Sequence, residues 1–240
     1  TADMLENEQI NNFGADIFWR PSTNFQATAA LQPDFGSVES DDVVVNLGAF
    51  ETFFPEKRLF FQEGIEVFTA TPRAEDKRPV TLLNTRRIGG VGREPILPDN
   101  VTLTDPERQK PVELAGALKT VGSIGALRYG LLGAVEKEAI YEAQGQRFVQ
   151  SGTDYGVGRV LYEDKTAAGD YRAIGWLGAL TAHAEQDTQA HGVDYHYLTA
   201  AGKWKIDGQF LFSSADERSD GFGGFADIRR NFGQGRRLHL

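Results

Sequence analysis

The chain contains no cysteine, which excludes disulfide bonds and thiolate metal sites from its chemistry. It has no stretch approaching the roughly 18 consecutive apolar residues that a membrane-spanning helix requires, so a helical membrane protein is excluded. Basic residues are too few to balance the acidic ones, and a formal net charge of −9 argues against a nucleic-acid partner. All-β architectures stay open, because strands of about 10 residues with alternate apolar side chains can cross a membrane without such a run.

Catalytic motifs are missing as well. The sequence has no Gly-x-Ser-x-Gly elbow, no His-Glu-x-x-His pair and no phosphate-binding glycine loop, and its histidines form no ligand motif. With 34 acidic residues some carboxylate pair always lies at a suitable distance, so their number does not indicate glycoside hydrolysis. The acidic run at residues 39–42 lacks the ligand spacing and glycine of a calcium loop. We therefore expect no enzyme, no metal site and no cofactor.

Alternation of apolar and polar residues dominates the second half of the chain. Between residues 203 and 214 one face carries Trp204, Ile206, Phe210 and Phe212, while the other carries Lys203, Lys205, Asp207 and Gln209. Similar alternation occurs at residues 24–32, 127–136, 171–181 and 193–197. The connections between these runs alternate between short and longer polar turns, as in up-and-down barrels. The pattern predicts successive antiparallel hairpins.

Two regions of the first half are rich in proline and charge, namely residues 70–79 and 92–112. Proline at this density removes the hydrogen-bond donors that central strands need, so we predict that both regions are loops. We expect residues 1–240 to form a single β-barrel domain that includes them, since β architectures of this length are commonly one domain.

The segment 33–68 follows neither a helical nor a strand period. It mixes phenylalanine with acidic and basic residues, a composition that suits neither lipid nor bulk water. We interpret it as a plug-like segment that folds inward, occupying the lumen of a barrel or capping one end. We expect Phe50, Phe53, Phe54, Phe60 and Phe61 to be largely buried.

Charged residues in and after this segment are the candidate ligand-binding or lumen residues. They are Glu51, Glu56, Lys57, Arg58, Glu63, Arg86 and Arg87. Aromatic faces and carboxylates are typical of saccharide sites, so one interpretation is a solute pathway or a sugar site. The other, which we favour, is that these charges pair with one another and hold the inward segment to the barrel wall, because buried charges persist chiefly when paired and hydrogen-bonded.

Several runs in this segment carry a resemblance to a known family. They are PDFGSVE at 33–39, VNL at 45–47, FETFFPEKR at 50–58 and FFQEG at 60–64, with a fainter echo in RRIG at 86–89. On these residues the chain resembles the DUF5916 family of bacterial proteins. In that family an outer-membrane-type β-barrel domain often follows a carbohydrate-binding module of the family 9 type. The resemblance is specific for the family, which has no assigned function.

The resemblance implies an all-β fold, an antiparallel up-and-down β-barrel of the outer-membrane type or part of one, located in the bacterial outer membrane. Lipid is then a partner, and a further barrel segment or a partner chain is needed where these strands are too few to close. We interpret the start at Thr1 as the result of a removed signal peptide or an expressed fragment. The implied role is uptake or binding of an extracellular saccharide. The alternative is a soluble β-sheet accessory or binding module of a glycan-degrading protein.

Overall fold

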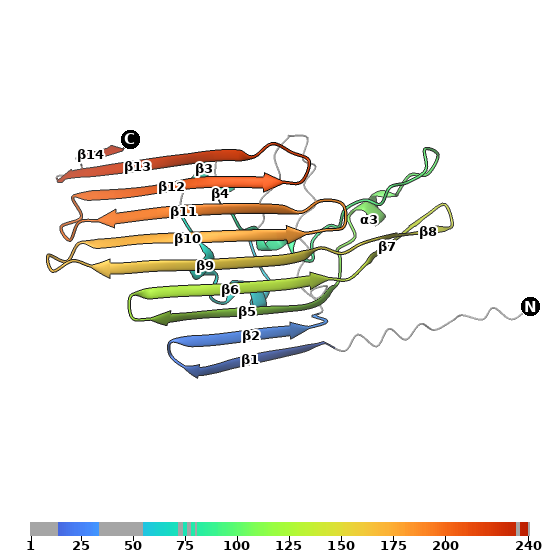
Figure 1. Cartoon of the computed structure of the whole chain (residues 1–240), viewed down its shortest axis with the longest axis horizontal. Coiled ribbons are helices and arrows are strands. Elements are labelled where there is room, and N and C mark those ends of the chain that lie inside the picture. Colours follow the sequence, from blue (N-terminus) through green and yellow to red (C-terminus); the bar gives the residue numbers. More distant parts are fainter. Residues whose placement is uncertain are drawn as a thin grey trace, which may run out of the picture.

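The computed structural model describes residues 14–33, 55–71, 74–75, 78–79, 81–233 and 236–239. Ten strands of this part of the chain form one antiparallel sheet with up-and-down order (Figure 1). In their order across the sheet, they are β1 (Ala15–Ser22), β2 (Phe25–Leu31), β5 (Leu114–Ile124), β6 (Leu127–Glu136), β9 (Asp154–Lys165), β10 (Tyr171–Ala182), β11 (Thr188–Leu198), β12 (Trp204–Ala215), β13 (Gly221–Gly233) and β14 (Arg236–His239). The all-β, antiparallel part of the prediction is confirmed.

The sheet is open within the described residues. Its edges are β1 and β14, and these two strands do not pair with each other there. Connections at one end of the strands are short, as between Ser22 and Phe25 or Ile124 and Leu127, and this end is called the short-turn end below. Those at the other end include the two long excursions, from β2 to β5 and from β6 to β9.

Smaller elements lie in the long connections. They are α1 (Leu59–Gln62), α2 (Ile65–Phe68), β3 (Ala74–Glu75), β4 (Arg78–Pro79), the 3₁₀ turn η1 (Thr85–Arg87), α3 (Asp105–Arg108), β7 (Ala139–Ala143) and β8 (Gln146–Gln150). Within residues 70–79, which the sequence predicts to be a loop, β3 and β4 pair in a short two-stranded ladder. Residues 92–112 are irregular apart from α3 and an isolated bridge between Pro111 and Val91. The helix begins at Asp105 and has Pro106 in its first turn, where a missing N–H leaves no helical bond unmade.

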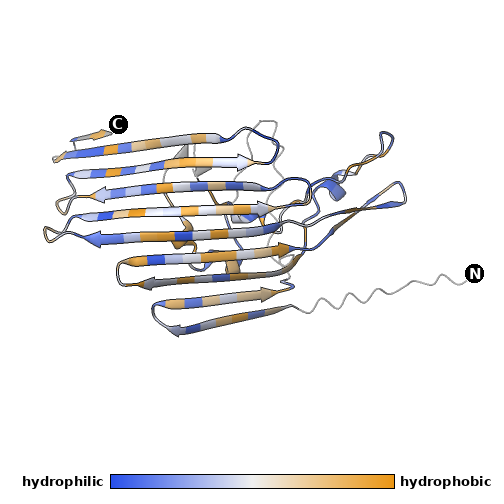
Figure 2. Ribbon diagram, in the orientation of Figure 1, coloured by the Kyte–Doolittle hydropathy of each residue, from blue (hydrophilic) through white to orange (hydrophobic). Residues whose placement is uncertain are grey.

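The two faces of the ten-stranded sheet have different surroundings. Side chains of each strand alternate between the faces, which Figure 2 shows as alternating colours along the strands. Described residues of the segment 55–112 are called the covering segment. The part up to Ile88 packs on one face of the sheet, which we call the covered face, whereas Val101 and Leu103 pack against the β7–β8 hairpin. The opposite face has no second layer among the described residues, and we call it the open face. The described part of the predicted plug-like segment, residues 55–68, thus lies on one face of the sheet.

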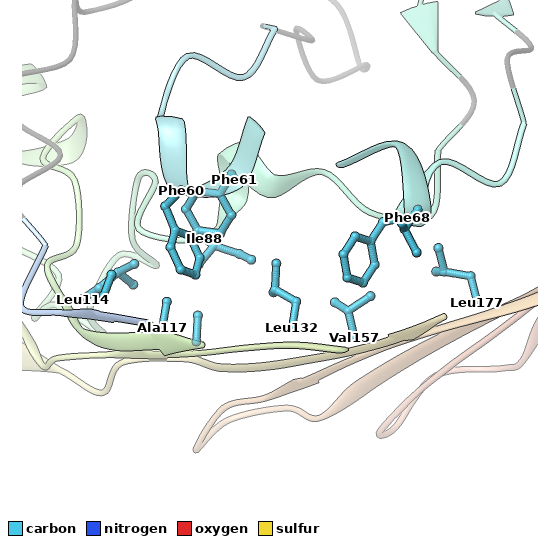
Figure 3. Close-up of a cluster of buried hydrophobic side chains, with 12 residues drawn as sticks. Phe60, Phe61, Phe68, Ile88, Leu114, Ala117, Leu132, Val157 and Leu177 are labelled. Carbon is cyan, nitrogen blue, oxygen red and sulfur yellow. The ribbon is translucent and has the colours of Figure 1, made fainter. Parts of the chain in front are cut away.

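Apolar side chains join the covering segment to the sheet. Phe60, Phe61, Phe68 and Ile88 pack against residues of the covered face (Figure 3). Those sheet residues include Leu114, Ala117, Leu132, Val157 and Leu177. Burying each large side chain stabilises the contact by about 1.5–3 kcal/mol. The expected burial of Phe60 and Phe61 is confirmed, whereas Phe50, Phe53 and Phe54 lie outside the described residues.

The hairpin of β7 and β8 extends past the sheet and has a small core of its own (Figure 1). Tyr141 and Ala143 of β7 pack there against Val101 and Leu103 of the covering segment. The hydroxyl of Tyr141 donates to the carbonyl of Arg93 at 3.0 Å. No helix among the described residues is long and apolar enough to span a membrane.

Candidate functional site

The centre of the covered face holds a buried ion pair. Arg159 of β9 reaches across β10 to Asp194 of β11 with both terminal nitrogens, and the Nη2 to Oδ2 distance is 2.8 Å. Gly175 of β10 makes this crossing possible, because a Cβ there would lie 2.6 Å from Arg159 Nη1. The two side chains are 1% and 0% exposed, so each charge depends on the other for compensation.

A row of alternating charge continues from Asp194 toward β12. His196 places Nε2 3.0 Å from Asp194 Oδ2 and Nδ1 2.7 Å from Asp207 Oδ1. Lys205 Nζ lies 3.0 Å from the other oxygen of Asp207. Both histidine nitrogens therefore face acceptors, which suits the doubly protonated ring, since only that form donates from both nitrogens.

The same histidine connects the row to the covering segment, because its Nε2 lies 3.1 Å from the carbonyl oxygen of Ala70. Lys119 of β5 makes a second polar connection. Its ammonium donates to the carbonyls of Phe60 and Glu63, at the end of α1. A cation at a helix C-terminus satisfies carbonyls that have no helical partner. The charges of the covered face thus hold the covering segment by its backbone.

A second cluster of polar side chains lies at the short-turn end of the covered face and is partly exposed to solvent. Arg128 of β6 lies 3.8 Å from a carboxylate oxygen of Glu66 in α2 and 3.8 Å from one of Glu163 in β9. Tyr171 donates its hydroxyl to Glu163 at 3.1 Å. Arg128 and Glu163 are 32% and 31% exposed, so they are accessible to a solute. These four residues are called the Arg128 group below.

Two of the predicted site residues, Glu56 and Arg58, form a buried pair within the covering segment. Nε and Nη2 of Arg58 each lie 2.8 Å from a carboxylate oxygen of Glu56. The same guanidinium donates to the carbonyls of Thr85 and Ile88 at 2.6 and 2.5 Å, and it stacks on Phe61. Burial alone would raise the pKa of Glu56, but hydrogen bonds from Arg58 outweigh it and hold the pKa below its ordinary value of 4.5.

The other predicted site residues have less direct roles. Glu63 contributes its carbonyl to Lys119, and the carbonyl of Arg87 accepts from Tyr155 at 3.3 Å. Arg86 belongs to η1, whose first turn is closed by the side chain of Asn84. Lys57 follows Glu56 and its amide donates to that carboxylate at 3.1 Å. Glu51 lies outside the described residues.

The structure therefore brings Glu56, Arg58 and the backbone of residues 85–88 together within the covering segment. Sequence reasoning missed Lys119, Arg159 and Asp194. A signal was present for two of them, because Lys119 and Asp194 are each the only Asp, Glu, Lys or Arg residue of their strand, and Arg159 interrupts the apolar and glycine-rich run at residues 156–161. No group of three or more potential metal ligands occurs among the described residues.

The open face is apolar across the sheet. Large side chains exposed on it include Ile17, Trp19, Leu31, Leu118, Leu131, Val160, Ile174, Trp176, Leu180, Val193, Tyr195, Phe210 and Phe222. The face assignment follows from the register, in which Val160, Trp176, Val193 and Phe210 are successive cross-strand neighbours. All three tryptophans of the chain, the third being Trp204, lie on this face.

Comparison with known proteins gives one match. A family model described as "Domain of unknown function (DUF5916)" matches residues 2–151. No curated protein and no solved structure matches the chain.

Proposed function

The chain belongs to the DUF5916 family, and we propose that its ten-stranded sheet is the wall of an outer-membrane-type β-barrel. In this proposal the open face lies against lipid and the covering segment lies inside. The protein then belongs in the bacterial outer membrane, and its inner surface binds or admits a polar solute, for which we propose an extracellular saccharide.

The observation that carries the proposal is the distribution of residues between the faces. On β12 the side chains of Trp204 and Phe210 are 37% and 57% exposed on the open face, while Gln209 on the covered face is 5% exposed. In water an apolar surface extending over ten strands would far exceed the few hundred Å² that monomeric proteins usually expose in one patch. Lipid removes that difficulty, because hydrocarbon is the environment these side chains prefer.

Strand length supports the same environment. From β5 to β13 the strands of the sheet have 10 to 13 residues. A tilted transmembrane strand needs about 9–11 residues to cross the hydrocarbon core. The strands are therefore long enough to cross and have a few residues to spare for the interfaces.

The end rows of the open face fit a membrane interface. At the short-turn end Arg172 pairs with Asp164 at 2.9 Å, and Tyr197 donates to Asp170 at 3.1 Å. Trp204 occupies the same end of β12. Aromatic and charged side chains in such positions are typical of the girdles that flank the lipid-facing band.

A barrel in hydrocarbon must close, because unpaired backbone N–H and C=O groups there cost several kcal/mol each. The proposal therefore requires partners for β1 and β14. They can pair with each other after the sheet curls, or with strands of another barrel segment or a partner chain.

The Arg128 group supports a polar solute on the inner side. It offers a carboxylate, a guanidinium and a phenol within one partly exposed cluster, and hydroxyl-rich ligands use such groups. The ion pair of Arg159 and Asp194 is too deeply buried to do so.

Fluorescence and sedimentation test the membrane part. The purified chain should require detergent to stay monodisperse. It should float with phosphatidylcholine vesicles, with blue-shifted emission from its open-face tryptophans. A chain that is monodisperse without detergent and does not float would favour the soluble accessory module instead.

Calorimetric titration with a panel of neutral oligosaccharides tests the solute part. Glu163→Gln should weaken binding about tenfold, the loss expected when one charged hydrogen-bond partner is removed. Asp164→Asn is the matched control, since the next residue points to the open face and should leave binding unchanged. If no oligosaccharide of the panel binds, the saccharide part is wrong while the membrane part stands.

A further inference from the structure

We propose that the short-turn end of the open face carries a binding site for the phosphodiester group of an anionic glycerophospholipid, formed by Arg230, Lys203, Trp204 and Phe232. This inference rests on the proposed function, because it assumes that lipid meets the open face.

The site is a surface cavity of about 400 Å³ between β12 and β13. It is lined by Ala201, Lys203, Trp204, Arg230, Asn231, Phe232 and Gly233. Trp204 and Arg230 are cross-strand neighbours, and the amide of Asn231 donates to the carbonyl of Lys203 at 2.8 Å. Lys203 precedes the first residue of β12, so the alternation that assigns Lys205 to the covered face does not fix the Lys203 side chain, and this residue lines the cavity.

Arg230 is held by aromatic rings instead of by an acid. Its guanidinium carbon lies 4.8 Å from the centre of the Trp204 ring and 4.6 Å from that of Phe232. Stacking of this kind uses the faces of the guanidinium and leaves N–H groups on its edge available to an oxygen ligand. Within the described residues neither Arg230 nor Lys203 has an ion-pair partner, although the chain carries a net charge of −9.

Arg172 provides the internal contrast. It lies on the same face and at the same end of the sheet, yet its charge is compensated by Asp164 at 2.9 Å. Two uncompensated cations in one cavity therefore distinguish the Arg230 site from its surroundings.

The chemistry of the cavity matches a phosphodiester at a membrane interface. Guanidinium binds phosphate oxygens in a bidentate manner, and an ammonium adds a point charge. Tryptophan prefers the headgroup level of a bilayer. The next open-face positions along the two strands are Ile206 and Ile228, which pair with each other, so the surface becomes apolar where an acyl chain would follow.

Quenching of single tryptophans by brominated lipids tests the site. In the full chain, Trp19→Phe with Trp176→Phe leaves Trp204 as the sole tryptophan of three. In phosphatidylcholine vesicles, brominated phosphatidylglycerol and brominated phosphatidylcholine are compared at the same mole fraction. We expect phosphatidylglycerol to be enriched about fivefold next to Trp204, the effect of one basic residue near an anionic surface.

Variants assign the enrichment to the cavity. Arg230→Gln should abolish the preference for phosphatidylglycerol, Arg230→Lys should keep most of it, and Arg172→Gln should leave it unchanged. A companion protein that keeps only Trp176, in the middle of β10, should be quenched equally by both lipids and reports insertion of each variant.

The outcomes separate the two proposals. If neither Trp176 nor Trp204 is quenched by either lipid, the membrane proposal fails and this site with it. If Trp176 is quenched but Trp204 shows no preference, or if Arg230→Gln keeps the preference, the phospholipid site alone is overturned. Soluble glycerophosphate at constant ionic strength should not displace the lipid, and displacement at low millimolar concentration would identify a free phosphate-ester site instead.

Discussion

The two faces of the sheet invert the usual relation between charge and burial. On β9, Arg159 is 1% exposed while the next residue, Val160, is 42% exposed. On β10, Trp176 is 42% exposed beside the fully buried Leu177. The covered face retains charges because each has a partner or backbone carbonyls, whereas the open face retains apolar side chains that no described residue covers. Burial alone therefore does not identify the environment of a side chain in this protein, and the partners of each group do.

Removing one charge of the buried pair should produce the largest effect. Arg159→Ala leaves Asp194 buried without compensation and should reduce the free energy of unfolding by about 3–5 kcal/mol. Urea titration in detergent measures it. The double variant Arg159→Met with Asp194→Leu should recover most of the loss, because replacing a buried pair by apolar residues is often neutral. An Arg159→Ala protein as stable as the parent would show that the covered face is hydrated.

Placing a charge on the open face should have the second largest effect on stability. Phe210→Arg should reduce the free energy of unfolding in bilayers, and so destabilise the folded protein, by about 2–4 kcal/mol if that position lies near the midplane. Ser214→Arg is the control, because it lies on the same face near the end of β12, where the cost should be about 0–1 kcal/mol. Equal effects at both positions would contradict a depth-dependent lipid environment.

Breaking the ion pair of Glu56 and Arg58 within the covering segment should have the next largest effect on stability. Arg58→Ala leaves the carboxylate of Glu56 without its main partner and removes a donor from two carbonyls, and we expect a loss of about 3 kcal/mol at most. The shift in denaturation midpoint measures it. A negligible shift would place the segment at the surface.

Low pH should destabilise the folded protein through Glu56 of the covering segment. Because its folded pKa lies below the ordinary value of 4.5, its contribution to stability is present above that value and is lost as pH falls through the folded pKa. Unfolding midpoints measured from neutral pH down to about pH 3 should decline less steeply in Glu56→Gln than in the parent. Identical profiles for the two proteins would argue against the pair.

The smallest effect should come from the exposed ion pair of the open face. Arg172→Gln should leave the unfolding midpoint unchanged within error, because solvent-exposed ion pairs contribute little. A clear loss would indicate that this pair lies in a drier environment than its exposure suggests.

The faces of β12 were predictable from sequence, because alternation along one strand assigns Trp204, Phe210 and Gln209 to their sides without knowledge of any partner. The pairing of Glu56 with Arg58 was also predictable in kind, since the two residues are close in sequence. Local information was sufficient in both places.

The remaining features depend on register across strands. Arg159 and Asp194 are 35 residues apart, and their contact requires β10 between them with a glycine at the crossing point. The helices α1 and α2 have 4 residues each, too few for a helical period to show. Their position is fixed instead by contacts such as that of Lys119 with the end of α1, which no local pattern encodes.

The covering segment lies in the connection between β2 and β5, two strands that pair with each other, so the strand order of the sheet does not depend on it. Leu31 pairs with Gly116, and the amide of Gln32 donates to the carbonyl of Ala115 at 3.1 Å, so the chain returns beside the point where it left. A tight turn would connect strands about 4.8 Å apart equally well. The residues between are thus an insertion in a hairpin, and natural variation can change their length without shifting the register of any strand. The insertion is constrained all the same, because Lys119 donates to the carbonyl of Phe60 and His196 contacts the carbonyl of Ala70, so an insertion of another length must still place carbonyl oxygens at these two positions.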